Sequence, residues 1–366
     1  MKVIKVFFLF IILFLSVSPV LAVGSDINNS GKVDIFDYNT LLSNFGKTGS
    51  DIVGDIDKNG KVDIFDYNKL LTDFGRTEVQ SIVFNSNKTG NHEIYSLNLN
   101  SQEKVQLTSD VTKEHFWGRL SPDKTKILYY QTPKGQSENY TETSLWMMNS
   151  DGTDKKLLRP KGTNSWEVQG HAEWSPDGTK LVMFGGSQMN PQIVITDING
   201  NPLTLVTTRG GQNIDPSFSP DGTKIVFIAC PESQCVNASF EVYQIQIDGS
   251  GLTRLTNDTN TDNDPYFSPN GEKIAWIKQT EPSTNFNLGK WNIWVMDHAG
   301  TNLRSLTNDN QINSRPEWSK DGLSIYFHRL ELGAFDFFRI FEINLDGSNL
   351  HQIIGEPGVV YEFPSL

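Results

Sequence analysis

The sequence predicts a mainly β protein, a six-bladed β-propeller preceded by a small α-helical domain. Two observations carry this prediction. From residue 81 onward, a phrase of the form aromatic-Ser-Pro-Asp-Gly recurs between apolar runs, and near the start the block GKVDIFDYN occurs twice. The 366 residues are many for one average domain, although a propeller can use most of such a length as one closed unit. Two folded parts are therefore expected.

Each copy of the repeated phrase predicts a β-hairpin. Pro fixes one backbone dihedral and Gly accepts a positive φ, so the phrase forms a turn between two strands. A third and a fourth strand follow, as in EVYQIQIDGS and LTRLTND, and four strands per repeat indicate propeller blades. The five complete copies are LSPDKTKILYY at 120, WSPDGTKLVMF at 174, FSPDGTKIVFI at 218, FSPNGEKIAWI at 267 and WSKDGLSIYFH at 318.

The sixth blade requires both ends of the repeat region. Residues 362–366 match the start of a first strand, whereas the matching second strand lies at residues 81–84. Pairing of these two segments would close the propeller and remove exposed sheet edges. The repeats resemble the TolB-type family of β-propellers, with its PD40 repeats, and the resemblance implies a TolB-like six-bladed propeller over residues 81–366.

The duplicated block predicts two calcium loops. Each copy places oxygen-bearing side chains at loop positions 1, 3, 5, 9 and 12 with Gly at position 6, as a calcium loop requires. The first set of ligands is Asp26, Asn28, Ser30, the Lys32 carbonyl, Asp34 and Asp37. The second set is Asp55, Asp57, Asn59, the Lys61 carbonyl, Asp63 and Asp66. We expect two bound calcium ions, with solvated Asp/Asn/Gly turns as the alternative.

A short amphipathic helix is expected after each loop, ending near Gly46 and Gly75. Two calcium loops, each followed by one helix, resemble dockerin modules over residues 25–75. The resemblance implies docking to a cohesin-type domain on a scaffold or surface protein, through loop positions 10 and 11. These positions hold Ile35, Phe36, Ile64 and Phe65. They either face a hydrophobic partner groove or pack into the module's own core.

Residues 1–22 have the pattern of a signal peptide, with Lys2 and Lys5 before an apolar run and small residues at the exit; an uncleaved anchor is the alternative. We therefore expect a secreted or cell-surface protein, with residues 76–80 as a short linker. In an exported chain Cys230 and Cys235 can form a disulfide, with free thiols as the alternative. The formal charge of −12 argues against a nucleic-acid partner.

The inner strands should place one residue each around the central channel. These residues lie four positions before each repeat Ser, or at the matching place in the C-terminal segment. They are Trp117, His171, Asp215, Asp264, Arg315 and Phe363. Such a ring at one channel mouth would suit a protein, peptide or glycan ligand. Alternatively, Asp215 and Asp264 only cap loops.

Catalytic signals are weak. There is no Gly-x-Ser-x-Gly motif, and one His falls in the predicted ring. Glu173 and Glu317 occupy equivalent repeat positions and could act as acid and base on a glycoside, although repetition by the fold is the simpler cause. The sequence therefore favours an exported, calcium-binding interaction protein. The alternative is an extracellular polysaccharide lyase or hydrolase delivered by its dockerin.

Overall fold

The computed structural model describes residues 25, 27, 33, 35–49, 52–56, 58–73, 81–208, 210–230, 239–282, 289–331 and 337–366. The predicted signal peptide and linker lie outside these residues. Among the residues described, no helix is long and apolar enough to cross a membrane.

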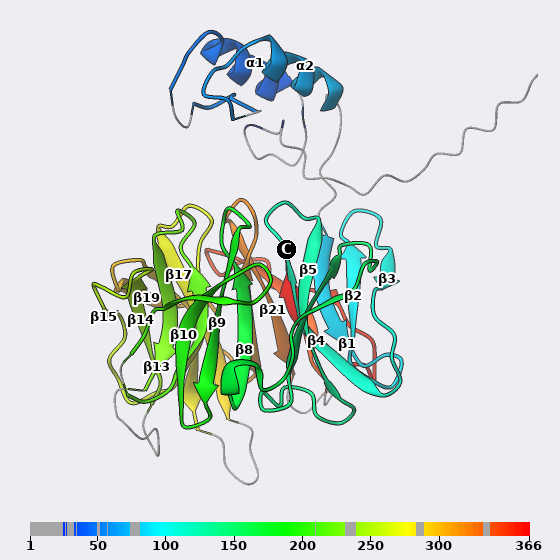
Figure 1. Cartoon of the computed structure of the whole chain (residues 1–366), viewed down its shortest axis with the longest axis vertical. Helices are drawn as coiled ribbons and strands as arrows, with labels where there is room; N and C mark the ends of the chain where they lie inside the picture. Colours follow the sequence, from blue (N-terminus) through cyan, green and yellow to red (C-terminus); the bar gives the residue numbers. More distant parts are fainter. Residues whose placement is uncertain are drawn as a thin grey trace, which may run out of the picture.

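The helical part consists of α1 (Ile35–Asn44) and α2 (Ile64–Asp73), drawn in blue in Figure 1. A small core joins the two halves of the duplication. Its buried members are Val33, Leu41, Val62 and Leu70, with Ile27, Tyr38, Ile52, Ile56 and Tyr67 packed against them. Gly46, with φ of 83°, follows α1 in the left-handed conformation expected after a helix end. The duplicated sequence thus forms one two-helix unit.

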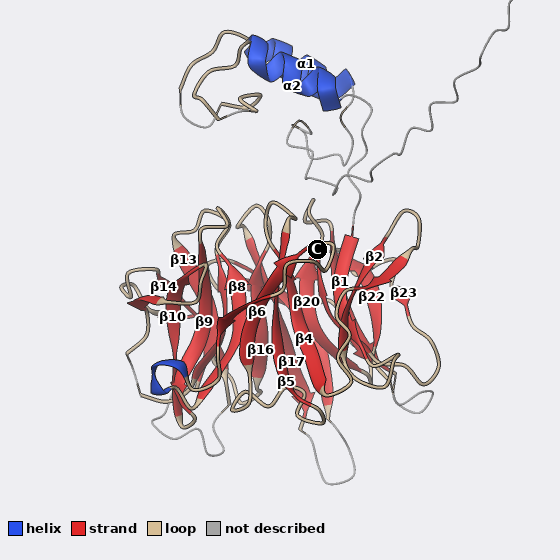
Figure 2. Cartoon of the chain, turned by 45° about the vertical axis from the view of Figure 1, so that its right-hand side comes forward, coloured by secondary structure: helices blue, strands red, loops and turns tan. Residues whose placement is uncertain are grey.

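The regular secondary structure of the remaining described chain is all strand, apart from one short 3-10 helix at Thr163–Ser165 (Figure 2). One sheet has the order β24-β1-β2-β3 and contains β1 (Ser81–Ser86), β2 (Glu93–Asn98), β3 (Lys104–Gln106) and β24 (Tyr361–Ser365). Three more four-stranded sheets follow the chain order. They contain β4 (Lys113–Leu120), β5 (Lys126–Pro133), β6 (Ser144–Asn149) and β7 (Lys156–Arg159); β8 (Val168–Trp174), β9 (Lys180–Ser187), β10 (Asn190–Asp197) and β11 (Pro202–Leu205); and β12 (Asn213–Phe218), β13 (Lys224–Ala229), β14 (Glu241–Gln246) and β15 (Thr253–Arg254).

The last sheet has eight strands. It contains β16 (Asp262–Phe267), β17 (Lys273–Glu281), β18 (Lys290–Asp297), β19 (Thr301–Ser305), β20 (Ile312–Trp318), β21 (Ser324–Leu330), β22 (Arg339–Asn344) and β23 (His351–Ile354). A parallel pair between Trp291 and Ile312 joins β18 to β20. The described residues therefore contain four separate four-stranded sheets and one eight-stranded sheet, where the sequence predicted six separate blades. Contact between β18 and β20 accounts for this difference.

Both ends of the propeller meet in one sheet. Strand β24 pairs antiparallel with β1, with Asn85 opposite Glu362, and the amide of Asn85 donates a hydrogen bond to that carboxylate at 3.3 Å. Figure 1 places the C-terminus beside the strands drawn in cyan. The sheet is therefore built from segments that lie far apart in the sequence.

The repeated turns owe their geometry to the Ser and Asp of the phrase. Between β12 and β13 the Ser219 hydroxyl donates to Asp221 at 2.6 Å and accepts from the Lys224 amide at 2.9 Å. Gly222 follows with φ of 68°, which glycine tolerates best. The hydrogen bond from Ser219 lowers the pKa of Asp221, so this carboxylate stays charged and orders the turn.

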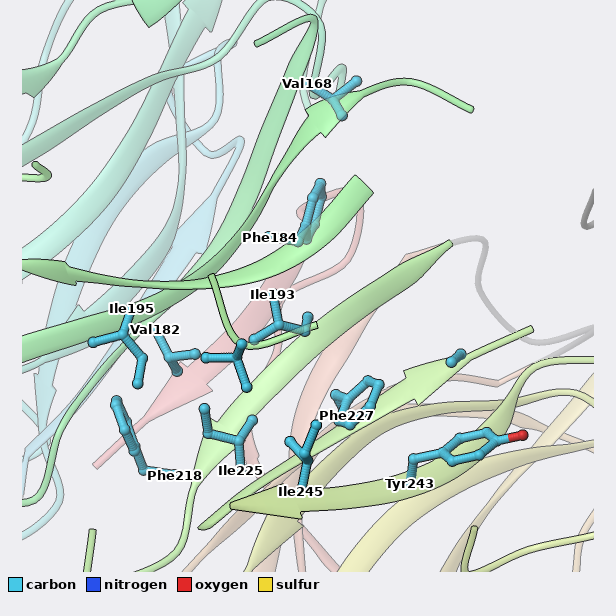
Figure 3. Packing of buried hydrophobic residues seen from close by; sticks show 12 residues of the cluster. Val168, Val182, Phe184, Ile193, Ile195, Phe218, Ile225, Phe227, Tyr243 and Ile245 are labelled. Atoms are coloured by element: carbon cyan, nitrogen blue, oxygen red, sulfur yellow. The ribbon is translucent and has the colours of Figure 1, made fainter. Parts of the chain in front are cut away.

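The core lies between neighbouring sheets. Figure 3 shows Val182 and Ile193 of one sheet facing Ile225 and Phe227 of the next. All four side chains are fully buried. Strands β9 and β13 each contain a nearly continuous apolar run, because a sheet covered on both faces needs apolar residues on each. The packed sheets form a rigid frame for the residues on the inner strands.

Candidate functional site: a packed ring in the propeller channel

Each predicted ring residue sits at an irregularity of its inner strand. The pairing register shifts at this point in all six strands, as at a β-bulge. All six residues have positive φ: Trp117 57°, His171 50°, Asp215 53°, Asp264 52°, Arg315 57° and Phe363 53°. Left-handed backbone at non-glycine residues is uncommon. Its repetition indicates that the bulges serve to direct these side chains.

The ring residues contact one another. Trp117 stacks on His171, with ring centroids 4.0 Å apart and planes 8° apart, and lies 5.4 Å from the ring of Phe363. The guanidinium of Arg315 lies over the Trp117 ring at 4.6 Å and over the Phe363 ring at 5.1 Å. Trp117 and Phe363 are each 1% exposed. The aromatic half of the ring is therefore closely packed.

The polar half is held by ion pairs and a hydrogen-bonded chain. Arg315 pairs with Asp264, and His171 Nδ1 contacts the Asp215 carboxylate. The hydroxyl of Tyr140 lies 2.5 Å from His171 Nε2. Burial lowers the pKa of His171 to about 4, so a neutral imidazole accepts from Tyr140 and donates to Asp215 at neutral pH. Burial opposes the charge on Asp215, but His171 and Arg315 lower the pKa of this carboxyl.

A metal is one ligand that this ring could hold. Among the described residues, His171, Asp215 and Asp264 are the one group whose ligating atoms converge, all within 4.8 Å of one another. However, Arg315 already neutralises Asp264, and His171 already pairs with Asp215. A cation would have to displace these contacts. The ring is therefore balanced internally and does not fit a resident metal.

The loop between β5 and β6 covers one side of the ring. It supplies Tyr140 and also Glu138, whose carboxylate lies 3.9 Å from Arg315. Tyr140 borders a surface cavity of about 300 Å³ that Phe184 and Ile214 also line. Sequence reasoning missed this loop because it lies outside the repeat. The equivalent connection between β13 and β14 is longer, so loop length gave no signal.

A second buried layer lies two residues further along the inner strands. Arg119 Nε donates to Glu173 at 2.6 Å, and its Nη2 donates to the Tyr266 hydroxyl at 3.1 Å. Glu317 belongs to the same layer, and burial raises its pKa to about 8. Glu173 and Glu317 were the paired carboxylates of the glycosidase hypothesis. Glu173 is instead bound by Arg119 and Tyr266, so it has a structural partner of its own.

The sequence placed the ring at a channel mouth, and the structure corrects this placement. Five ring residues are buried, at most 8% exposed, and the Arg315 side chain is 13% exposed. The bulges turn the side chains inward, where they pack against one another. The ring is a packed layer within the channel, and not an open rim that a large ligand could contact.

The second predicted calcium loop is largely described. Asp66 is fully buried in the first turn of α2 and accepts hydrogen bonds from the amides of Ile56, at 2.7 Å, and Asp63, at 2.8 Å. Asp55 accepts from the Gly60 amide at 2.8 Å, and Gly60 has φ of 84°. Carboxylates at loop positions 1 and 12 thus bracket a turn at Gly60, and this donor set suits calcium.

Other predicted ligands are less completely placed. Asn59 accepts from the Lys61 amide at 2.9 Å, and Asp37 in α1 is fully buried, like its counterpart Asp66. Six predicted ligands lie outside the described residues. They are Asp26, Asn28, Ser30, Lys32, Asp34 and Asp57.

The predicted partner-binding residues are exposed on the helical unit. Ile35 and Phe36 are 51% and 67% exposed, and Ile64 and Phe65 are 51% and 66% exposed. These values agree closely between the two copies. Of the two alternatives in the sequence, the structure therefore favours solvent-facing side chains over packing in the unit's own core.

Cys230 is disulfide-bonded and buried. Cys235, the other cysteine of the sequence, lies outside the described residues.

Repeated sheets around a channel, with Ser-Pro-Asp-Gly or a related turn after five of the inner strands, define a β-propeller. Comparison with protein families agrees, because residues 138–287 match PD40, the TolB beta propeller domain. A protein TolB homolog from Chlorobium luteolum is 30% identical over 152 residues, which cover 41% of this chain and 31% of the relative. The match therefore spans less than a third of that relative's length.

Solved structures show the same fold. TolB from Acinetobacter baumannii matches with a TM-score of 0.61 and 18% identity, over 82% of this chain and 69% of that one. A putative TolB from Agrobacterium tumefaciens matches with a TM-score of 0.57 and 17% identity, over 76% and 89%. A hydrazine synthase from Kuenenia stuttgartiensis shares the fold at a TM-score of 0.60 and 13% identity, over 79% and 46%. At these identities the likeness concerns the fold alone.

Proposed function

We propose that this chain is an exported, calcium-binding interaction protein, in which a dockerin-like unit binds a cohesin-type partner and a six-bladed TolB-like propeller recognises a protein, peptide or glycan. The observation that carries the proposal is the duplicated loop-and-helix unit with matched exposed Ile-Phe pairs. The six-blade count treats β16–β19 and β20–β23 as two blades of four strands each, beside the four separate sheets.

Calcium would stabilise the helical unit through buried carboxylates. Asp37 and Asp66 are each fully buried at equivalent places of the two helices. A buried carboxylate is costly unless it is hydrogen-bonded, paired or coordinates a cation. Calcium would add coordination to the amide hydrogen bonds that Asp66 already accepts. The core that joins the two halves has four fully buried apolar residues, few for an independent domain. Metal binding would therefore supply much of the unit's folding free energy.

The exposed Ile-Phe pairs support a partner surface. Phe36 and Phe65 expose about two thirds of their area, which a soluble unit tolerates only at a cost unless a partner covers it. The two pairs sit at the start of equivalent helices, so either helix could dock in the same manner. Export would place this surface outside the cytoplasm, in agreement with the leader-like residues 1–22.

A pull-down from the native secretome tests the proposal. We expect the chain to capture a cohesin-bearing protein in calcium and to lose it in chelator. The double variant F36A/F65A should lose capture, whereas L203A, which removes an apolar side chain 56% exposed on β11, should retain it. Capture that is unchanged by chelator and unchanged in the double variant would contradict the docking role.

One observation favours a second candidate, an extracellular lyase or hydrolase acting on polysaccharide. Tyr140, His171 and Asp215 form a hydrogen-bonded chain of the kind that moves protons, and Tyr140 borders a cavity. Turnover of pectin or a related glycan that disappears in H171A, with an unchanged melting temperature, would support this candidate. Absence of turnover in the wild type would exclude it for the glycans tested.

A further inference from the structure

A larger cavity, of about 490 Å³, opens on the side of the repeated turns. Prolines of four successive turns line it, together with Lys320 at the same repeat position. These prolines are Pro122, Pro176, Pro220 and Pro269. Because equivalent positions of successive repeats border it, the cavity lies around the propeller axis. Tyr266 and Glu317, from the layer below the ring, contribute polar groups to its lining.

Glu317 lacks a cation of its own. Within the described residues it forms no ion pair, and its one hydrogen bond is with the backbone of Leu366. The nearby guanidinium of Arg119 is committed elsewhere, because its three nitrogens donate to Glu173, the Pro364 carbonyl and Tyr266. Two carboxyl groups thus share one guanidinium, which binds only Glu173 directly.

The other acidic groups of the lining are already satisfied. Glu342 accepts from the Ser324 hydroxyl at 2.5 Å, and Asp321 accepts from the Ser319 hydroxyl at 2.7 Å. The lining contains two lysines and three acidic residues. Ionisation of Glu317 adds one negative charge to this lining, which a single positive charge on a ligand would offset.

Aromatic side chains complete the lining. They are Phe218, Tyr266, Phe267, Trp318 and Tyr326. Aromatic faces attract cations, and Arg119 already lies 5.9 Å from the Tyr266 ring centroid. A buried carboxyl beside such walls is a common way to bind an organic cation.

We propose that this axial cavity binds a single ammonium or guanidinium group, with the Glu317 carboxylate as its counter-ion. The cation belongs either to a Lys or Arg side chain of a protein ligand or to a free amine. The inference deepens the recognition role proposed for the propeller and does not involve the calcium loops.

Binding is coupled to proton release. Burial, with a further contribution from Glu173 and against the opposing effect of Arg119, raises the pKa of Glu317 to about 8. At pH 7 the free cavity therefore holds a protonated Glu317. A bound cation stabilises the carboxylate, so up to one proton leaves for each ligand that binds. A neutral ligand of the same shape would release none.

Isothermal titration of the full mature chain in calcium, at pH 7 in two buffers of different ionisation enthalpy, tests the proposal. The probes are acetyl-arginine amide, its uncharged isostere acetyl-citrulline amide, and n-butylguanidine. We expect acetyl-arginine amide to bind about tenfold or more tightly than acetyl-citrulline amide, with proton release. Equal binding of n-butylguanidine indicates that a small free cation suffices, whereas weaker binding indicates a peptidic ligand.

Variant E317Q keeps the shape of the side chain and cannot ionise. It should abolish both the preference for arginine and the proton release, whereas E281Q, which removes the same charge from an exposed ion pair with Lys290, should change neither. Equal affinities for the arginine and citrulline probes in the wild type, or no binding of either cation, would overturn the proposal. The comparison of the arginine and citrulline probes on the wild type tests the proposal even if E317Q does not fold. If the cation proposal fails, calcium-dependent capture of a partner can still be observed, because the calcium loops are not part of this cavity.

Discussion

Replacing Asp262 by asparagine should make the propeller less sensitive to alkaline pH. Asp262 lies on β16, is fully buried, and accepts a hydrogen bond from Trp276 Nε1 at 2.9 Å. Burial raises its pKa from 3.8 to about 7, against the opposing effects of Thr256, Trp276 and Lys278. The pKa of Asp262 is higher in the folded than in the unfolded chain. The contribution of Asp262 to the free energy of unfolding is therefore fully present below pH 3.8 and is lost as the pH rises through 7.

The magnitude follows from the shift. Between the two pKa values the unfolded chain has released the proton and the folded chain has not, so the free energy of unfolding falls by about 1.4 kcal/mol per pH unit. From pH 5 to pH 7 this amounts to about 3 kcal/mol. Asparagine imitates the protonated acid and keeps an oxygen for Trp276. The variant D262N should therefore gain stability relative to wild type as the pH rises.

Urea denaturation of wild type and D262N at pH 5, 6, 7 and 8 measures this difference directly. Other carboxyl groups titrate in both proteins, so the difference between them isolates Asp262. If the dependence of the unfolding free energy on urea concentration is the same in both proteins, a difference in urea midpoint reports a change in stability and not a change in the denatured state. A difference that stays flat across this range would refute the reasoning, because it would show that Asp262 titrates alike in the folded and unfolded states.

Three further variants test the ring and the predicted calcium loops. W117A should lower the free energy of unfolding by about 3–5 kcal/mol, because it removes a buried indole that packs against His171 and Phe363. A shift of the urea midpoint no larger than that of a surface variant would contradict this packing. D264N removes the direct ion-pair partner of Arg315 and leaves Glu138 and the His171-bound Asp215 as its nearby carboxylates, so thermal denaturation at pH 8 should show a loss of about 3 kcal/mol. The paired variant D264N/R315Q should recover part of this loss. D66A should prevent calcium from increasing the helical circular dichroism of the mature chain, and an unchanged calcium response would remove Asp66 from the ligand set.

The repeated phrase was sufficient to predict the hairpins and the register of the ring. Ser219, Asp221 and Gly222 fix the turn locally, so each copy predicts its own hairpin without tertiary information. The position four residues before Ser219 therefore identified Asp215 correctly as an inner-strand residue. The left-handed backbone at Asp215 was not predictable, because a bulge depends on pairing with the neighbouring strand.

The loop between β5 and β6 and the burial of the ring were not predicted from the sequence. Tyr140 reaches His171 from a loop that matches no repeat, and nothing in its local sequence specifies that contact. Similarly, the stacking of Trp117 on His171 depends on two strands of different sheets. Such contacts join residues that are distant in the sequence, so they depend on how the sheets assemble. The repeat pattern in the sequence predicts only the individual strands and turns.

Because β1 pairs with β24, the sheet that contains both strands can be completed only at the end of propeller folding. The hydrogen bond from Asn85 to Glu362 spans 277 residues, and bringing the ends of a chain of that length together costs about 5 kcal/mol of conformational entropy. The two strands cannot pair until the intervening sheets exist to hold them close. Until then, β1 presents an unpaired edge during synthesis. Its last partner arrives with the final residues of the propeller, so a chain stalled before residue 361 is the form most exposed to aggregation.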